Sequence, residues 1–206
     1  MTDIIFKLIN KEANLEFLDN VPYKDFLDMA VVFYQVQPKT EEEESEGITC
    51  HIVDNNMMEK WGVSADELFE KATENTPKIL GLKVQGILSA IAEYSGNAEV
   101  PDLAGLEEAD IPLYVATNTN CNHGASVLLY RDFLRAVAAK LKSDLYIIPC
   151  SVHEIIIFKS ITGCQIDTEA LTDLISQVNR KEIAKSDVLS DSLYFYSRED
   201  NELCIA

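Results

Sequence analysis

The sequence lacks the segments that mark membrane proteins and nucleic-acid-binding proteins. It contains no run of 18 apolar residues, so we expect no membrane span. Its 17 lysines and arginines are outnumbered by 35 aspartates and glutamates, and they form no basic stripe for direct nucleic-acid binding. The first residues carry neither a basic segment nor a small-residue cleavage site, so we predict no secretory signal.

Motifs that would indicate a cofactor or a metal are also missing. The five cysteines include no C-x-x-C pair, and an odd number without that spacing is typical of a reduced, cytoplasmic protein. No glycine-rich loop has the pattern of a phosphate-binding motif. The histidines and cysteines are spaced more loosely than zinc ligands normally are. We therefore predict no cofactor. We also predict no metal at the six candidate ligands, which are Cys50, His51, Cys121, His123, Cys150 and His153.

Acidic residues are concentrated in the first part of the chain. Residues 1–120 hold 23 acidic and 8 basic side chains, whereas residues 121–206 hold 12 and 9. A field of this sign repels nucleic acid and anionic membranes and attracts basic partners. The commoner explanation is simpler, because an acidic surface also keeps a protein soluble without any partner.

Two acidic segments form the candidate binding surface. Residues 38–47 contain five glutamates, and repulsion among them predicts a solvated loop. In the helix predicted over residues 64–75, three acids recur every four residues and should form a stripe on its outer side. The predicted binding residues are Glu41, Glu42, Glu43, Glu44, Asp66, Glu70 and Glu74.

Apolar periodicity predicts an α+β fold with a mixed, mostly antiparallel sheet of six or seven strands covered by helices. The central strands are expected at residues 144–159, where two β-branched runs flank a polar break and should form a hairpin. Other strands are predicted at residues 4–9, 26–36, 48–53, 113–118, 125–130 and 193–196.

Capping residues predict where the helices begin. Asp54, Ser64 and Asp167 each precede a helical pattern, and Ser64 with Glu67 forms a capping box. The helix after Ser64 should end near residue 75, before a proline. Further helices are predicted over residues 81–95 and 131–142, and the tail from residue 198 should be frayed. The predicted core consists of Val31, Phe33, Leu129, Phe133, Val137, Ile147, Ile156, Phe158, Leu171 and Ile175; on the helix after Asp167, Leu174 and Val178 should also face inward.

The domain organisation follows from these elements. We predict one α+β unit over residues 1–206. Residues 96–110 contain glycine, proline and several acids, a composition typical of a linker. The alternative is therefore a pair of β-β-α-type halves, 1–95 and 111–206, joined by this segment.

The polar break of the central hairpin collects four reactive side chains, Cys150, Ser151, His153 and Glu154. A Cys–His or Ser–His pair here could supply the nucleophile and base of a hydrolase. Because residues i and i+2 share a face of a strand, Ser151 and His153 would lie on one side and Glu154 on the other. Yet no G-x-S-x-G elbow is present, and polar side chains in turns more often satisfy backbone groups. This turn is the alternative site.

Three stretches of the chain resemble a known family. They are T-N at 117–118 with G-A at 124–125 and L-L-Y at 128–130; S-D-L-Y-I-I-P at 143–149 with S-V-H-E at 151–154; and L-S-D-S-L-Y at 189–194 with Tyr196. Together with weaker upstream matches they are similar to an uncharacterised bacterial family, a domain of unknown function, over nearly the whole chain. The family tends to have serine where this chain has Cys150. The resemblance implies one integrated unit and no assigned activity.

These observations predict a non-enzymatic binding module whose acidic N-terminal half engages a basic protein partner. One form of this hypothesis is an inhibitor that occupies the nucleic-acid groove of its target, as phage or mobile-element anti-defence proteins do. The alternative is a hydrolase that uses Cys150 or Ser151 with His153. The sequence leaves the oligomeric state open.

Overall fold

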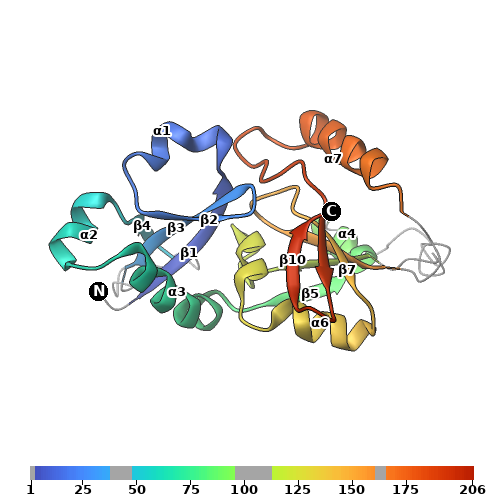
Figure 1. Ribbon diagram of the computed structural model, residues 1–206, viewed down its shortest axis with the longest axis horizontal. Coiled ribbons are helices and arrows are strands. Elements are labelled where there is room, and N and C mark those ends of the chain that lie inside the picture. The colour runs from blue at the N-terminus through green and yellow to red at the C-terminus, as the bar shows by residue number, and fades with distance from the viewer. Residues whose placement is uncertain (1–2, 38–47, 96–112, 161–165) are drawn as a thin grey trace.

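The computed structural model describes residues 3–37, 48–95, 113–160 and 166–206, and its strands form two antiparallel sheets (Figure 1). Sheet A contains β1 (Ile4–Asn10), β2 (Tyr23–Phe26), β3 (Met29–Val36) and β4 (Cys50–Ile52). Sheet B has the order β10-β9-β7-β8-β6-β5. Its strands are β5 (Lys83–Gly86), β6 (Leu113–Thr117), β7 (Leu145–Ile148), β8 (Ile155–Lys159), β9 (Tyr194–Ser197) and β10 (Glu202–Ile205). The predicted α+β class is confirmed, but the strands divide into two sheets and every described pairing of these strands is antiparallel.

Helices join and cover the two sheets (Figure 1). They are η1 (Glu12–Asn14), α1 (Leu15–Leu18), α2 (Asn55–Trp61), α3 (Ala65–Leu80), α4 (Ile87–Ser95), η2 (Gly124–Leu129), α6 (Phe133–Leu141) and α7 (Thr168–Glu182). Within the described part of the chain, no helix has both the length and the apolar character needed to cross a membrane.

The capping residues act as the sequence predicts. The Asp54 side chain accepts a hydrogen bond from the backbone N–H of Met57, and the Asp167 side chain accepts one from Ala170. Ser64 and Glu67 bond reciprocally in a capping box at the start of α3. Each cap satisfies backbone N–H groups that have no partner within the first helical turn, so these three helix starts are confirmed.

The central hairpin is also confirmed. β7 pairs with β8 in register, with Ile147 opposite Ile157, and this pair lies in the middle of sheet B. Both isoleucine side chains are fully buried. Because the turn between the two β-branched runs is short, the runs can pair as neighbouring antiparallel strands, and this pairing buries both of them.

The strand predicted over residues 26–36 is present as β3, but it begins later, at Met29, because Phe26 ends β2 and the chain turns between the two strands. The chain reverses at Leu27 and Asp28, and Leu27 has a left-handed φ of 54°. Leucine rarely adopts this conformation, so the turn gave no local signal. The Asp28 carboxylate accepts hydrogen bonds from the hydroxyls of Ser190 and Ser192 and from Tyr194. Contacts with sheet B therefore hold the turn.

Two further predictions fail because tertiary burial overrides local signals. Residues 125–130, predicted as a strand, lie mainly in η2, whose apolar side chains are surrounded by core. A short apolar run that is buried on all sides has no periodicity that separates strand from helix. Helix α3 continues past Pro77 to Leu80, although it was expected to end near residue 75. Burial of Thr76 and Leu80 offsets the hydrogen bond that the proline cannot donate.

The remaining differences concern both ends of sheet B and one helix face. Residues 83–86 form edge strand β5 and only the following residues are helical, while the tail expected to fray forms β10. On α7, Leu174 and Val178 are 53% and 43% exposed, not buried as predicted. The buried Asn179 amide donates hydrogen bonds to the Ser190 carbonyl and the Asp191 carboxylate, and these bonds orient the helix around its axis.

The predicted core is largely present. Six of its ten residues are buried, and the other four, Leu129, Val137, Ile156 and Leu171, are partly buried. One large hydrophobic cluster includes side chains of both sheets, among them Phe33 and Ile147. The predicted linker, 96–110, lies outside the described residues, but β5 before it and β6 after it pair within sheet B. The sheets do not divide at that segment, and the division into two halves stays a prediction.

Among the described strands none pairs with the outer edge of β1, which is closed by side-chain hydroxyls instead. The backbone N–H of Phe6 donates to the Thr76 hydroxyl of α3 over 3.1 Å, and that of Leu8 donates to the Ser126 hydroxyl of η2 over 3.2 Å. Thr76 in turn donates to the Ala72 carbonyl. Buried N–H groups on a strand edge must find acceptors. These two bonds therefore join sheet A to α3 and to the loop region of sheet B.

Replacing either hydroxyl should destabilise the fold. Thr76→Val and Ser126→Ala each leave one buried N–H without an acceptor, so we expect a loss of about 1–3 kcal/mol in the free energy of unfolding. Urea denaturation would measure it. Thr73→Val is the matched control on α3, because the described partner of its half-buried hydroxyl is the Phe69 carbonyl of its own helix. Equal losses for Thr73→Val and Thr76→Val would contradict this account of the β1 edge.

Candidate functional site

The acidic stripe lies on the exposed face of α3. Asp66, Glu70 and Glu74 are all exposed, as their spacing predicts. The Lys24 ammonium of β2 forms an ion pair with Asp66, so part of the negative charge is neutralised. The other predicted acidic segment, Glu41–Glu44, lies outside the described residues.

A shallow recess of about 290 Å³ accompanies this stripe, lined by Val63, Glu67, Glu70, Lys71 and Glu74. The carboxylate of Glu67 accepts hydrogen bonds from the Ser64 backbone and hydroxyl, and these bonds hold its pKa below the usual value. Bonds to the charged form stabilise that form, so Glu67 stays ionised. Chemically, the recess is suited to a basic side chain.

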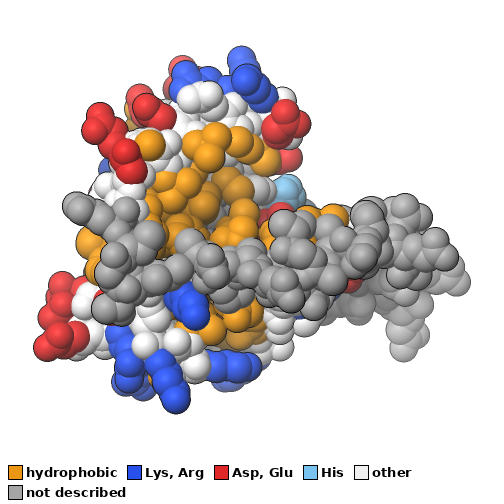
Figure 2. Space-filling view, turned by 90° about the vertical axis from the view of Figure 1, so that its right-hand side faces the viewer, with side chains coloured by type: hydrophobic (Ala, Val, Ile, Leu, Met, Phe, Trp, Pro, Cys, Tyr) orange, Lys and Arg blue, Asp and Glu red, His pale blue; other side chains and the backbone are white. Residues whose placement is uncertain are grey.

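The opposite end of the molecule has a different character. Figure 2 faces the end that carries sheet B and shows hydrophobic side chains near its centre, with described charges of both signs around them. This view agrees with the nearly balanced composition of residues 121–206. Helix α3 carries four exposed acids, Asp66, Glu67, Glu70 and Glu74, and two exposed lysines, Lys71 and Lys78.

The 150–154 turn joins β7 to β8, and its polar side chains are occupied by backbone groups. Ser151 is buried, and its hydroxyl accepts a hydrogen bond from the backbone N–H of His153 over 3.0 Å. The His153 Nδ1 accepts one from the backbone N–H of His123 over 3.3 Å. Its Nε2 lies 3.7 Å from a carboxylate oxygen of Asp187. Nδ1 must be unprotonated to accept, so the neutral ring carries its hydrogen on Nε2.

Cys150 is poorly suited to nucleophilic attack. Burial raises the pKa of its thiol, and the nearby Glu154 carboxylate raises it further. The thiolate is the reactive form of cysteine, so a raised pKa lowers reactivity at neutral pH. The four side chains are thus neighbours in the turn, but no hydrogen bond from the His153 ring to Cys150 or Ser151 is present among the described residues.

His123 is a half-buried histidine whose pKa keeps it neutral at neutral pH. It sits in a left-handed conformation with φ of 49°, and its ring centre lies 5.7 Å from that of His153. Burial, followed by the positive charge of Lys7 and by His153, lowers its pKa to about 4. Its Nδ1 is buried and has no hydrogen-bond partner in the part of the chain that the structure describes. Within the described residues, no three histidine, cysteine or acidic side chains are grouped to hold a metal.

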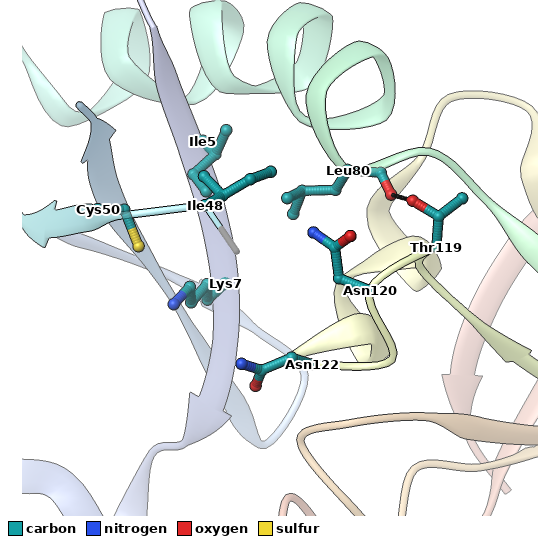
Figure 3. Close-up of a pocket in the computed structure, with 8 residues that line it drawn as sticks. All are labelled: Ile5, Lys7, Ile48, Cys50, Leu80, Thr119, Asn120 and Asn122. Carbon is teal, nitrogen blue, oxygen red and sulfur yellow. Dashed lines mark hydrogen bonds between the residues drawn. The ribbon is translucent and has the colours of Figure 1, made fainter. Parts of the chain in front are cut away.

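A larger cavity, of about 440 Å³, lies between sheet A, the end of α3 and the loop that follows β6 (Figure 3). Lys7 lines it from β1, and Asn120 and Asn122 line it from the loop. None of these three residues was selected from the sequence. The sequence shows a lysine inside the apolar run of β1 and an asparagine-rich loop after β6. Neither feature indicates that these two segments face each other across a cavity.

Comparison with known proteins gives one match. The model of DUF5688, a family of unknown function, matches residues 1–198. No curated protein and no solved structure matches the chain significantly. The family resemblance predicted from the sequence is confirmed, and the geometry of the sites is the basis on which a function can be argued.

Acid should destabilise the fold through His123. Its folded-state pKa of about 4 lies below its ordinary value of 6.5, so between these values only the unfolded chain binds the proton. Stability contributed by the neutral ring is complete above pH 6.5 and is lost as the pH falls toward 4. Asparagine tolerates the left-handed backbone. Between pH 7 and pH 4, the free energy of unfolding of His123→Asn should therefore fall less than that of wild type. We expect a difference on the order of 1 kcal/mol, because solvent screens a half-buried ring.

Urea denaturation across this pH range would measure the effect. The control is His51→Asn, since His51 is exposed on β4 and should leave the pH profile unchanged. A His123→Asn profile parallel to that of wild type would show that the imidazole is not titrating in this way.

Proposed function

The chain belongs to DUF5688, a family of unknown function, and we propose that this member is a non-enzymatic module that binds a basic protein partner. The observation that carries the proposal is the exposed acidic face of α3 with its carboxylate-lined recess. Asp66 is already paired with Lys24, whereas Glu70 and Glu74 form no ion pair with any described residue. These two carboxylates are therefore available to a lysine or arginine of a partner.

The spacing of these charges bears on the kind of partner. Residues four apart on a helix are separated by a rise of about 6 Å. Duplex DNA presents one charge per roughly 1.7 Å of its axis. The α3 stripe is thus sparser than a nucleic acid and complements a short basic segment of a protein better than a complete nucleic-acid groove. An inhibitor of a nucleic-acid-binding effector, the narrower form of the proposal, would need additional charge from segments such as Glu41–Glu44.

The hydrolase alternative has weaker support. A serine or cysteine nucleophile needs a base within hydrogen-bond reach. Ser151 and the His153 ring each accept a hydrogen bond from a backbone N–H, and burial raises the pKa of Cys150. These contacts favour a structural role for the turn, in agreement with the ordinary behaviour of polar side chains in turns.

Charge reversal on α3 should slow association with the partner. We expect Glu70→Lys with Glu74→Lys to reduce the association rate about tenfold at low salt, because like charges oppose the approach of a basic surface. The partner would first be captured from a cell lysate at low salt, and surface plasmon resonance would then give the rates at 50 and 300 mM salt. The wild-type rate should fall with added salt because ions screen the attraction.

The matched control is Glu169→Lys with Asp173→Lys, two exposed acids four residues apart on α7. It changes the net charge by the same amount on a different surface and should have little effect. Equal slowing by both double variants would show that association depends on net charge and not on the α3 surface. An association rate that does not change with salt would also contradict the proposal.

Thiol labelling distinguishes the binding-module proposal from the hydrolase alternative. We expect iodoacetamide at neutral pH to modify Cys204, which is exposed, faster than Cys150, whose pKa is raised by burial. Peptide mass spectrometry would follow both residues in the same sample. Rapid labelling of Cys150 that is abolished by His153→Ala would instead reveal an activated nucleophile.

A further inference from the structure

The cavity in Figure 3 combines apolar walls with one cationic group, Lys7, among its described lining residues. Ile5 of β1, Ile48 before β4 and Leu80 at the end of α3 provide apolar surface. Lys7 lies two residues after Ile5 and lines the same cavity, because alternate residues of a strand face the same side of a sheet. The cavity therefore lies at the boundary between sheet A and the loop that follows β6.

Lys7 has no carboxylate partner within ion-pair distance among the described residues, unlike Lys11 and Lys24, which pair with acids. Its ammonium lies 4.1 Å from the centre of the Tyr34 ring. Such a cation–π contact orients the ammonium without neutralising it. In a chain with a net charge of −18, a lysine that faces a cavity and keeps its charge free is available to a ligand.

The opposite wall is a loop held in one conformation by Asn118. This residue is only 1% exposed; its side-chain oxygen accepts hydrogen bonds from the backbone N–H groups of Asn120 and Asn122, and its amide donates to the Asn122 carbonyl. Cys121 and His123 adopt left-handed conformations within the loop. Non-glycine residues in such conformations persist where surrounding contacts hold them. The Asn118 side chain therefore holds the loop backbone in place, with Asn120 and Asn122 lining the cavity.

The upper wall is equally constrained. The backbone N–H and the hydroxyl of Thr119 both donate to the Leu80 carbonyl. A side chain at Gly81 would place its Cβ 2.6 Å from the Thr119 methyl group, so only glycine lets the two segments approach this closely. A wall held in this way needs little rearrangement to receive a ligand.

We propose that this cavity binds a small organic anion, with a carboxylate at Lys7 and the asparagine amides and an apolar body against Ile5, Ile48 and Leu80. Its volume of about 440 Å³ is within the range typical of small-molecule sites. The Lys7 ammonium attracts a carboxylate and repels a cation. Inorganic anions gain nothing from the apolar walls, and neutral molecules leave the ammonium without a counter-charge. The site is separate from the acidic face of α3.

Octanoate is a suitable probe of this site, and octylammonium and inorganic phosphate are its comparisons. Isothermal titration calorimetry should show octanoate binding, with hexanoate about fifteenfold weaker because it lacks two methylenes and each buried methylene contributes roughly a fourfold factor. Octylammonium and phosphate should not bind. Octanoate should also protect Cys50, which lines the cavity, from a thiol reagent.

Lys7→Met keeps the apolar stem and removes the charge, so it should weaken octanoate binding at least tenfold. Asn120→Asp is a second, isosteric test on an exposed residue; it should also weaken binding because it places a carboxylate beside that of the ligand. Lys140→Met is the matched control, since Lys140 lines a smaller cavity of about 250 Å³ beside α6 and should leave affinity and Cys50 protection unchanged.

Three results would overturn the proposal. The first is that octanoate fails to bind or to protect Cys50 in wild type. The second is that its affinity is unaffected by Lys7→Met and Asn120→Asp, or reduced equally by Lys140→Met. The third is that phosphate or octylammonium protects Cys50 at the same concentration as octanoate. Protection by phosphate would show that the apolar walls do not contribute to binding, and protection by octylammonium would show that the Lys7 charge does not.

Discussion

The two hydrogen bonds at the outer edge of β1 are the interaction on which the rest of the structure depends. Sheet A has an unpaired strand edge in the interior, and a strand edge cannot be buried unless its N–H groups find acceptors. Thr76 and Ser126 supply them from α3 and η2. These contacts position α3, whose outer face carries the exposed acids, and place β1 opposite the loop that follows β6. Both the acidic face and the cavity at Lys7 result from that docking.

A second polar contact links the sheets elsewhere and explains why sequence motifs far apart belong together. The Asp28 carboxylate in the β2–β3 turn accepts hydrogen bonds from Ser190, Ser192 and Tyr194. Burial and the Asp28 carboxylate raise the pKa of Tyr194, so its hydroxyl remains a donor at neutral pH. The serine- and tyrosine-containing stretch near the end of the chain therefore serves to attach sheet A to sheet B.

The residues that seemed most reactive in the sequence are the ones whose polar groups are already used by the fold. Ser151 and His153 accept hydrogen bonds from backbone N–H groups, and burial raises the pKa of the Cys150 thiol. The better candidates for binding are groups without a described charge partner, Lys7 in the cavity and the Glu70–Glu74 pair on α3. A free charge can gain energy from a ligand, whereas a satisfied turn residue must first lose its own bond.

The sequence by itself determined the features that depend on neighbours within a few positions: the central hairpin, the three helix caps and the acidic stripe on α3. Their energies arise from local hydrogen bonds and side-chain periodicity, which a sequence displays directly. Only the tertiary structure decided the turn at Leu27, the helical form of residues 124–129, the pairing of β10 and the meeting of Lys7 with Asn120. In each case distant segments supply the stabilising contacts, and those contacts outweigh local preferences that are weak or contrary.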